Sequence, residues 1–263
     1  MIKFTKMHGL GNDFIVINTI TTPISPEIFS NKKLSHRHLG IGFDQALLIG
    51  PSAHADFSCQ IFNADGTEAE QCGNGMRCIA RFLHEEKLSK KNIISIETKA
   101  GIVTATIQDY DHIQIAMGIP VIQKDPVKLV FESDILNRSA PAIVSMGNPH
   151  IIFNVPSVKT CPINEWGSVI SQHSLFPQGI NVGFMEIIDR NHIRLRTYER
   201  GSGETYACGS NACAAVVAGI NNDLLNSTVK VELTFGNLLI EWDKEPNPVL
   251  MTGPASRIFD GNI

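Results

Sequence analysis

The sequence has no long apolar run, no cluster of basic residues and no apolar core at its N-terminus. A membrane-spanning helix needs roughly 20 consecutive apolar residues, and no such run occurs. The net charge is only −4 and Lys and Arg are dispersed, so nucleic acid is not an expected partner. Without an apolar h-region at the N-terminus, no secretory signal is expected. We therefore expect a cytoplasmic protein.

The six cysteines include no C-x-x-C pair. They are Cys59, Cys72, Cys78, Cys161, Cys208 and Cys213. The local pairs Cys72/Cys78 and Cys208/Cys213 are spaced more widely than the short knuckles of zinc sites, so no metal is expected. A cytoplasmic location predicts reduced thiols. Cys59, Cys78, Cys161 and Cys213 are expected to be buried and inert.

The second half of the sequence repeats polar landmarks of the first at a constant offset. The matched positions are Gly11-Asn12 with Gly147-Asn148, Gln45 with Asn181, and Cys72-Gly73 with Cys208-Gly209. The offset is 136 residues in each case (147 − 11, 181 − 45 and 208 − 72). Such a repeat predicts a duplicated domain whose halves are related by a pseudo-two-fold axis.

Hydrophobic periodicity predicts more strands than helices in both halves. The predicted strands are Phe14–Asn18, Ala46–Ile49, Phe57–Phe62, Ile93–Thr98, Ile102–Ile107, His112–Ala116, Ile151–Val155, Gly183–Ile188, Ile193–Tyr198, Val229–Thr234 and Leu238–Trp242. One long helix is predicted directly after each Cys-Gly, because apolar residues recur there at helical spacing. We expect an α+β fold of two pseudo-symmetric lobes, residues 1–118 and 119–263, each a sheet wrapped around a central helix. The C-terminal tail from about residue 250 is expected to pack on the first lobe.

Cys72 and Cys208 each stand at or next to the N-cap of a predicted helix. Backbone N–H groups and the positive end of the helix dipole favour an anion there. The pKa of a cysteine, about 8.5 when free, falls to roughly 3.5–7.5 in such settings. The predicted symmetry places the two sulfurs on opposite sides of a cleft. A thiolate can then remove a proton from one face of an amino-acid α-carbon while the opposed thiol delivers another. No cofactor is required, because helix N-termini can hold the α-carboxylate.

Differences between the halves indicate what else the substrate carries. Asn63-Ala64 in the first half corresponds to Glu199-Arg200 in the second. A glutamate beside an arginine offers an acceptor for an ammonium group and a bidentate donor for a carboxylate; an ordinary surface ion pair is the alternative. Phe14 corresponds to His150, which can tune a cysteine or serve as a structural histidine.

These residues resemble the diaminopimelate epimerase family. The resembling stretches follow the family's order along the whole chain and are Phe4–Phe14, Gly42–Gln45, Phe62–Gly75, Gly147–His150, Tyr198–Gly209 and Met251–Ala255. The resemblance implies lobes built as β-barrel-like antiparallel or mixed sheets around a central helix. It also implies a homodimer without a cofactor that interconverts LL- and meso-2,6-diaminopimelate in lysine and peptidoglycan-precursor biosynthesis.

The resemblance also assigns roles to residues. It implies that Cys72 and Cys208 are the catalytic base and acid, and that His150 and Glu199 adjust their pKa values. The implied substrate-binding residues are Asn12, Gln45, Asn63, Gly73, Asn74, Asn148, Asn181, Glu199, Arg200, Gly209 and Ser210. Two positions depart from the family pattern: Asn211 stands where a glycine is usual, and Phe259 stands where a tyrosine is frequent.

Two other functions share parts of this pattern. A proline or hydroxyproline racemase would use the same two thiols but has no evident need of Glu199 and Arg200. A non-catalytic amino-acid binder or redox sensor would use the thiols to form a disulfide on oxidation.

Overall fold

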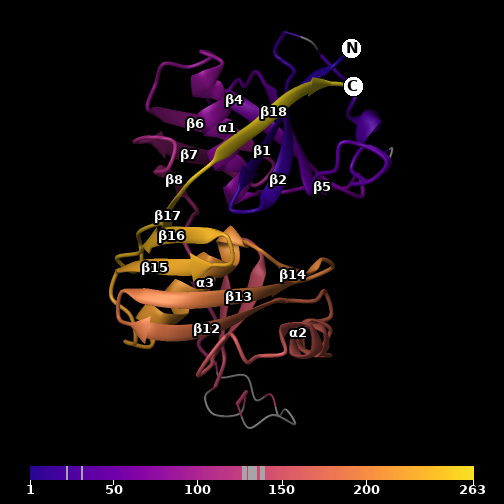
Figure 1. Ribbon diagram of the computed structural model, residues 1–263. Coiled ribbons are helices and arrows are strands. Elements are labelled where there is room, and N and C mark those ends of the chain that lie inside the picture. The colour runs from indigo at the N-terminus through magenta and orange to yellow at the C-terminus, as the bar shows by residue number, and fades with distance from the viewer. Residues whose placement is uncertain (22, 31, 126–128, 130–134, 137–139) are drawn as a thin grey trace. The chain divides into compact units, whose positions relative to one another are not determined.

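The computed structural model describes residues 1–21, 23–30, 32–125, 129, 135–136 and 140–263 (Figure 1). The chain forms two compact units. Unit 1 comprises Met1–Ala116 together with Gly253–Ile263, and unit 2 comprises Met117–Thr252. The change of unit thus falls between residues 116 and 117, against the expected 118 and 119, and the chain returns to unit 1 at its C-terminus.

Unit 1 is a mixed sheet with one long helix. Its elements are β1 (Lys3–Gly9), β2 (Asn12–Asn18), the 3-10 helix η1 (Pro26–Ser30), β3 (Gln45–Gly50), β4 (Phe57–Asn63), β5 (Glu68–Ala69), α1 (Gly73–Glu85), β6 (Ile93–Thr98), β7 (Gly101–Ile107), β8 (Ile113–Ala116) and β18 (Ser256–Asn262). The pairs β2–β3 and β4–β6 are parallel. The runs β18–β1–β2, β3–β4–β5 and β6–β7–β8 are antiparallel.

Unit 2 repeats this plan. Its elements are β9 (Val121–Ile122), β10 (Ala142–Ser145), β11 (Pro149–Asn154), α2 (Ile163–Ser171), β12 (Asn181–Asp189), β13 (His192–Glu199), β14 (Gly203–Thr205), α3 (Gly209–Asn221), β15 (Thr228–Leu233), β16 (Gly236–Glu241) and β17 (Leu250–Gly253). Here β11–β12 and β13–β15 are the parallel pairs. The helices α1 and α3 begin and end 136 residues apart (209 − 73 and 221 − 85). The pairing order and the helix positions agree with the duplication inferred from the sequence.

The Gly-Asn dipeptide of the repeat marks the turn that leads into a parallel strand. Leu10 and Gly11 form a two-residue turn between β1 and β2, and both have positive φ, 55° and 91°. Gly147 has φ 93° in the turn between β10 and β11. Glycine adopts these angles without the steric cost of a side chain, which explains why it recurs in both halves. Each turn therefore places the asparagine that follows it, Asn12 or Asn148, at or directly before the start of the next strand.

Both predicted helices are present, and each is the centre of its unit. Helix α1 packs against β1, β2, β3, β7 and β8, and helix α3 packs against β10, β11, β12, β13 and β16 (Figure 1). The predicted apolar stripe of α1, from Met76 to Leu83, is fully buried. Helix α3 carries smaller side chains and is buried from Asn211 to Ile220. Burial of these stripes against the sheets stabilises each unit.

The C-terminal return is held to α1 by two arginines. Nε of the fully buried Arg77 donates to the carbonyl of Pro254 at 3.0 Å, and Nη1 of Arg81 donates to the carbonyl of Ala255 at 2.6 Å. Strand β18 then pairs with β1. A fully buried arginine is unusual, and here Arg77 anchors the tail.

Sequence periodicity missed helix α2. Its buried residues are Ile163, Gly167, Ile170 and Ser171, which is a helical spacing. The signal was weak because the helix has only nine residues and contains a glycine. Gly167 is required, since a Cβ there would lie 2.4 Å from the ring of Tyr198. Helix α2 forms the crossover between the parallel strands β11 and β12, as η1 does between β2 and β3.

Candidate active site

In unit 1 three predicted site residues stand at one edge of the sheet. Strand β2 begins at Asn12, β3 begins at Gln45 and β4 ends at Asn63. Because β2 and β3 are parallel and β4 is antiparallel to them, these three strand ends coincide. Gln45 and Asn63 are register partners, and Nε2 of Gln45 donates to Oδ1 of Asn63 at 2.9 Å.

Gln45 retains a buried acceptor. Its Oε1 has no hydrogen-bond partner within the described part of the chain. An unsatisfied buried oxygen costs about 1–3 kcal/mol. A ligand that carries N–H donors, such as an ammonium group, would satisfy it. The neighbouring Asn63 is held in place, since its Nδ2 donates to Oγ1 of Thr67 at 3.0 Å.

Cys72 is the N-cap of α1. Its backbone is extended, with φ −147° and ψ 104°, and its sulfur accepts the N–H of Gly75 at 3.4 Å. The sulfur lies 3.7 Å from Oδ1 of Asn12, which also accepts from Nδ2 of Asn74 at 3.2 Å. The predicted helix start is confirmed, and Asn12, Cys72, Gly73 and Asn74 lie together around it. Helix N–H groups at such a start stabilise a thiolate or a bound carboxylate.

Asp44 sets the orientation of Asn12. Its Oδ2 accepts from Nδ2 of Asn12 at 2.9 Å, so Oδ1 of Asn12 is left facing Cys72. Asp44 also accepts from the backbone N–H of Asp13 at 3.1 Å and from Arg37 at 2.8 Å. Sequence analysis singled out the adjacent Gln45 and missed this carboxylate. The only sequence signal was its place within the Gly42–Gln45 stretch.

A buried ion pair supports the same hairpin. Lys6 and Asp13 are 6% and 9% exposed, and Nζ of Lys6 donates to Asp13 and to the carbonyl of Gly42. Burial alone would raise the pKa of Asp13, but hydrogen bonds from Arg37 and Lys6 lower it to about 2. The carboxylate therefore stays ionised and holds β1, β2 and the segment before β3 together.

Unit 2 presents a corresponding edge. Asn148 precedes β11, β12 begins at Asn181, and β13 ends at Glu199. Oδ1 of Asn181 accepts the backbone N–H of Arg200 at 3.0 Å, and its Nδ2 donates to the carbonyl of Pro149 at 3.3 Å. Asn181 therefore ties the start of β11 to the end of β13. The predicted residues of the second half lie at the ends of neighbouring strands, as in the first half.

Cys208 is the N-cap of α3, and its environment differs from that of Cys72. Its backbone is extended (φ −110°, ψ 106°), the residue is only 6% exposed, and its sulfur lies 3.5 Å from Oγ of Ser210. Burial raises the pKa of the Cys208 thiol well above its ordinary value, and the negative charge of Glu199 raises it further. The Ser210 hydroxyl and the backbone N–H of Asn211 act in the opposite direction. The structure thus favours the protonated thiol at Cys208.

His150 is fully buried beside this helix start. Its Nε2 lies 2.9 Å from Oδ1 of Asn148, and Nδ2 of Asn148 donates to Oγ of Ser210 at 3.5 Å. Burial, followed by the charge of Arg200, lowers the pKa of His150 to about 3. The imidazole is therefore neutral near pH 7, and it reaches Cys208 through Asn148 and Ser210.

Glu199 and Arg200 bond to different neighbours. Glu199 accepts from the hydroxyl of Thr205, and Nη1 of Arg200 donates to the carbonyl of Gln178 at 2.7 Å. Gly179 gives the arginine room, because a Cβ there would lie 2.7 Å from Cδ of Arg200. The carbonyl and the loop glycine hold the guanidinium in a defined position.

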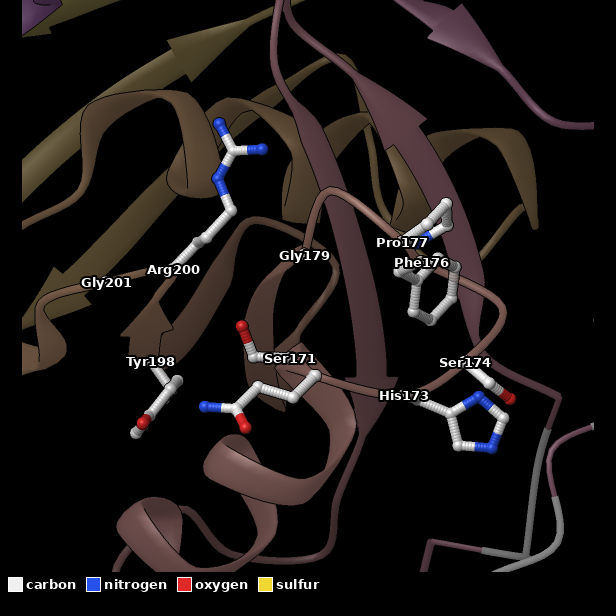
Figure 2. A pocket seen from close by; sticks show the side chains of 10 residues that line it. Ser171, His173, Ser174, Phe176, Pro177, Gly179, Tyr198, Arg200 and Gly201 are labelled. Atoms are coloured by element: carbon white, nitrogen blue, oxygen red, sulfur yellow. The ribbon is translucent and has the colours of Figure 1, made fainter.

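A pocket of about 450 Å³ lies beside Arg200 (Figure 2). Its lining includes Tyr198 and Arg200 on one side and His173, Phe176 and Pro177 on the other. The loop that follows α2 forms this second wall, so the helix that sequence periodicity missed also shapes the surroundings of Arg200. The sequence repeat did not predict this pocket.

The remaining cysteines, Cys59, Cys78, Cys161 and Cys213, are buried. Burial raises the pKa of Cys78 to about 12 and raises the pKa values of Cys59 and Cys161. Across the described ranges, no three His, Cys, Asp or Glu side chains cluster as a metal site would require. None of the helices in those ranges has the length and apolar character needed to cross a membrane.

Comparison with known sequences identifies relatives along the whole chain. The profile of the diaminopimelate epimerase family matches residues 4–123 and 142–258. A protein of Nitrosomonas europaea named diaminopimelate epimerase is 47% identical over 273 residues, which cover 100% of this chain and 98% of the relative. A protein of the same name from Nitrosomonas eutropha is 48% identical over 276 residues, with 100% and 99% coverage.

Comparison with solved structures shows the fold. A hydroxyproline epimerase from Agrobacterium vitis, crystallised with trans-4-hydroxy-L-proline, matches with a TM-score of 0.77. The match covers 99% of this chain and 91% of that chain at 14% sequence identity. This likeness confirms the expected α+β fold class. At so low an identity it does not bear on the substrate.

Proposed function

The chain belongs to the diaminopimelate epimerase family, and from this premise we propose that it interconverts LL- and meso-2,6-diaminopimelate with Cys72 and Cys208 as the two proton-transfer residues. The observation that carries the proposal is the pair of cysteine N-caps, one repeat apart, with Asn12 beside Cys72 and with Ser210 and Glu199 beside Cys208. The full-length identity to relatives named diaminopimelate epimerase supports the substrate.

The proposed reaction is a two-base proton transfer. A thiolate removes the proton from the α-carbon, and the C–H bonding pair stays on that carbon as a carbanion. The opposite thiol then donates its proton to the other face and becomes a thiolate. The stereocentre is inverted and the two cysteines exchange protonation states, so the reverse reaction uses the same residues in exchanged roles.

We assign the resting thiol to Cys208 and the resting thiolate to Cys72. Burial and Glu199 favour the protonated form of Cys208. Cys72 is only half-buried, so its thiolate is better solvated, and its sulfur accepts an N–H from the first turn of α1. The contact of this sulfur with Oδ1 of Asn12 belongs to the thiol form and is given up when the thiolate forms. In this state the enzyme is ready to remove a proton with Cys72 and to deliver one with Cys208.

The helix starts at Gly73 and Gly209 are proposed to hold the α-carboxylate. The negative charge that develops on the α-carbon and its carboxylate is stabilised by backbone N–H groups directed at it. A carbanion at this position needs no Schiff base if that stabilisation is strong. Asn74 and Ser210, the second residues of α1 and α3, would add side-chain hydrogen bonds.

The remaining predicted residues are proposed to bind the rest of the substrate. Diaminopimelate carries a second amino-acid group that does not react. Arg200 would bind its carboxylate, and Glu199 with the side-chain oxygens of Asn63 and Asn181 would accept from its ammonium group. The buried Oε1 of Gln45, which has no partner among the described residues, supports an ammonium ligand in the same way.

We further propose a cytoplasmic homodimer. The family resemblance supports this assembly, and β18 exposes Ile258 and Phe259 at 52% and 47%, an apolar surface that a partner subunit could cover. Light scattering of the purified protein would measure the oligomeric state. A monomer across micromolar concentrations would contradict the dimer.

One experiment tests the function. The purified protein is incubated with LL-diaminopimelate in D2O under a reductant, and deuterium at the α-carbon is measured together with the appearance of the meso form. We expect both. Proline and trans-4-hydroxyproline are the matched controls, and exchange into either of them without exchange into diaminopimelate would assign a racemase of the other class. A binder or redox sensor would introduce no deuterium into any of the three.

A further inference from the structure

Asn211 lies in the first turn of α3, at a position where the family resemblance implies a glycine. The side chain is fully buried and is held from two sides. Its Oδ1 accepts from Oγ1 of Thr197 at 3.2 Å, and its Nδ2 lies 3.1 Å from Nδ1 of His150. A Cβ on Gly183 would lie 2.4 Å from Oδ1 of Asn211, so the glycine in β12 provides the space for this amide. The site is built around an asparagine.

The contacts of His150 are compatible with one neutral tautomer. The amide nitrogen Nδ2 of Asn211 can only donate a hydrogen bond, so Nδ1 of His150 must accept it and carries no proton. The proton of the neutral ring then lies on Nε2, which donates to Oδ1 of Asn148 at 2.9 Å. In the other tautomer, the N–H at Nδ1 of His150 would face the N–H group of Asn211. The unprotonated Nε2 would then face the oxygen of Asn148, and neither pair could form a hydrogen bond.

The same direction of hydrogen-bond donation continues to the sulfur of Cys208. With its oxygen turned to His150, Asn148 presents Nδ2 to Oγ of Ser210 at 3.5 Å, at the long limit for a hydrogen bond. A Ser210 oxygen that accepts from Asn148 has its own O–H left to donate. The sulfur of Cys208 lies 3.5 Å from that oxygen. The orientation of each hydrogen bond therefore determines that of the next, from Thr197 in β13 to Cys208 at the start of α3.

We propose that Asn211 is a positioning residue that keeps His150 in the Nε2–H tautomer and thereby directs, through Asn148, the Ser210 hydroxyl proton onto the sulfur of Cys208. A hydroxyl that donates to the sulfur stabilises its thiolate, which must form in every turnover when Cys208 gives up its proton. This inference rests on the proposed role of Cys208. The opposite arrangement of the chain would turn the Ser210 proton towards Asn148 and leave the thiolate without that donor.

The first measurement uses the unmodified protein. Long-range ¹H–¹⁵N spectra of protein labelled at histidine distinguish a protonated from an unprotonated ring nitrogen, and the His150 signal is identified by its absence in H150Q. We expect a proton on Nε2 and none on Nδ1 near pH 7. A proton on Nδ1 in the unmodified protein would overturn the proposal.

The decisive variant is N211D. Aspartate has the same shape but can only accept, so Nδ1 of His150 becomes protonated, either as the other tautomer or as imidazolium. We expect this change together with a roughly tenfold or greater fall in kcat/KM for LL-diaminopimelate, since small misplacements at a reacting group have costs of this size. Nδ1 still unprotonated in a folded N211D protein would show that Asn211 does not set the tautomer. If N211D does not fold, N211L is judged by the same criterion, with a detectable fraction of protonated Nδ1 as the expected result.

The matched control is N221D, the same substitution at the exposed last residue of α3. It should leave both the His150 spectrum and kcat/KM unchanged. The tautomer is measured without substrate, so a failure of the proposed function appears separately, as absence of epimerisation by the unmodified protein with its Nε2–H signal intact.

Discussion

Asn12 and Asn148 lie one repeat apart, yet they present opposite ends of the side-chain amide to their helix starts. Oδ1 of Asn12 faces α1 and accepts from Asn74 at 3.2 Å, whereas Nδ2 of Asn148 faces α3 and donates to Ser210 at 3.5 Å. The hydrogen-bond partner of each asparagine determines which end of its amide faces the helix. Asp44 accepts from Asn12, and His150 donates to Asn148. The duplicated scaffold therefore gives its two cysteines chemically different surroundings.

The carboxylate behind Asn12 provides the first prediction. D44N replaces an obligate acceptor by an amide that can present either end, so Asn12 loses its fixed orientation towards Cys72. We expect kcat/KM to fall roughly tenfold. Steady-state kinetics with LL-diaminopimelate measures this, and D56N, at a carboxylate paired with Lys91 in the same unit, is the control. Kinetics of D44N equal to those of the unmodified protein would show that the orientation of Asn12 is unimportant.

Both cysteines should be essential for turnover. C72A and C208A each remove one of the two proton-transfer groups, and we expect epimerisation to fall by about 100- to 10,000-fold, the range of general acid–base contributions. Circular dichroism and thermal unfolding check that the variants fold. C161A, which changes a thiol bonded to the carbonyl of Ser157, should remain active. Near-normal turnover in either of the first two variants would end the two-base mechanism.

The two thiols should ionise in order. Because burial and Glu199 raise the pKa of Cys208, its thiol should lose its proton at higher pH than Cys72 does. The ultraviolet absorbance of thiolate, followed against pH in C72A and in C208A, separates the two titrations. The resting-state assignment would be reversed if the C72A protein, which retains Cys208, showed the lower midpoint.

Arg200 should determine use of the second amino-acid group. R200M keeps an unbranched apolar stem but removes the guanidinium, and we expect kcat/KM for diaminopimelate to fall roughly 100-fold, the size expected for lost charge-assisted hydrogen bonds. R190M, at a surface arginine bonded to Asn226 and Asp223, is the matched control. An unaffected R200M enzyme would mean that the distal carboxylate is bound elsewhere.

His150 should make the protein sensitive to mild acid. Its pKa is about 3 in the folded state and about 6.5 when unfolded, so the unfolded chain binds the proton more readily. The stabilisation is complete above about pH 6.5 and is lost as the pH falls towards 3. From pH 7 to pH 5 we expect the free energy of unfolding to fall by about 2 kcal/mol more in the unmodified protein than in H150Q. Urea unfolding measures this, with H54Q as a surface control, and equal slopes would show that His150 is not buried in its neutral form.

Much of the architecture follows from patterns that act over short distances along the chain. The apolar stripe after each Cys-Gly produces α1 and α3, and the glycine with positive φ before Asn12 and Asn148 turns the chain into the next strand. Both features depend on backbone geometry and helical or strand periodicity, which a single sequence carries. The offset of the repeat then predicts that the same side chains stand at the same strand ends.

The state of each site residue depends instead on partners brought together by folding. Asp44 bonds Asn12 across 32 residues, and Asn211 bonds His150 across 61. No local pattern encodes which end of an amide faces a sulfur, because hydrogen-bond orientation is a property of the assembled network. Likewise, the raised pKa of Cys208 arises from desolvation inside the packed unit. The amino-acid order was sufficient to place two cysteines at equivalent helix starts, whereas packing between distant strands makes one of them a buried thiol.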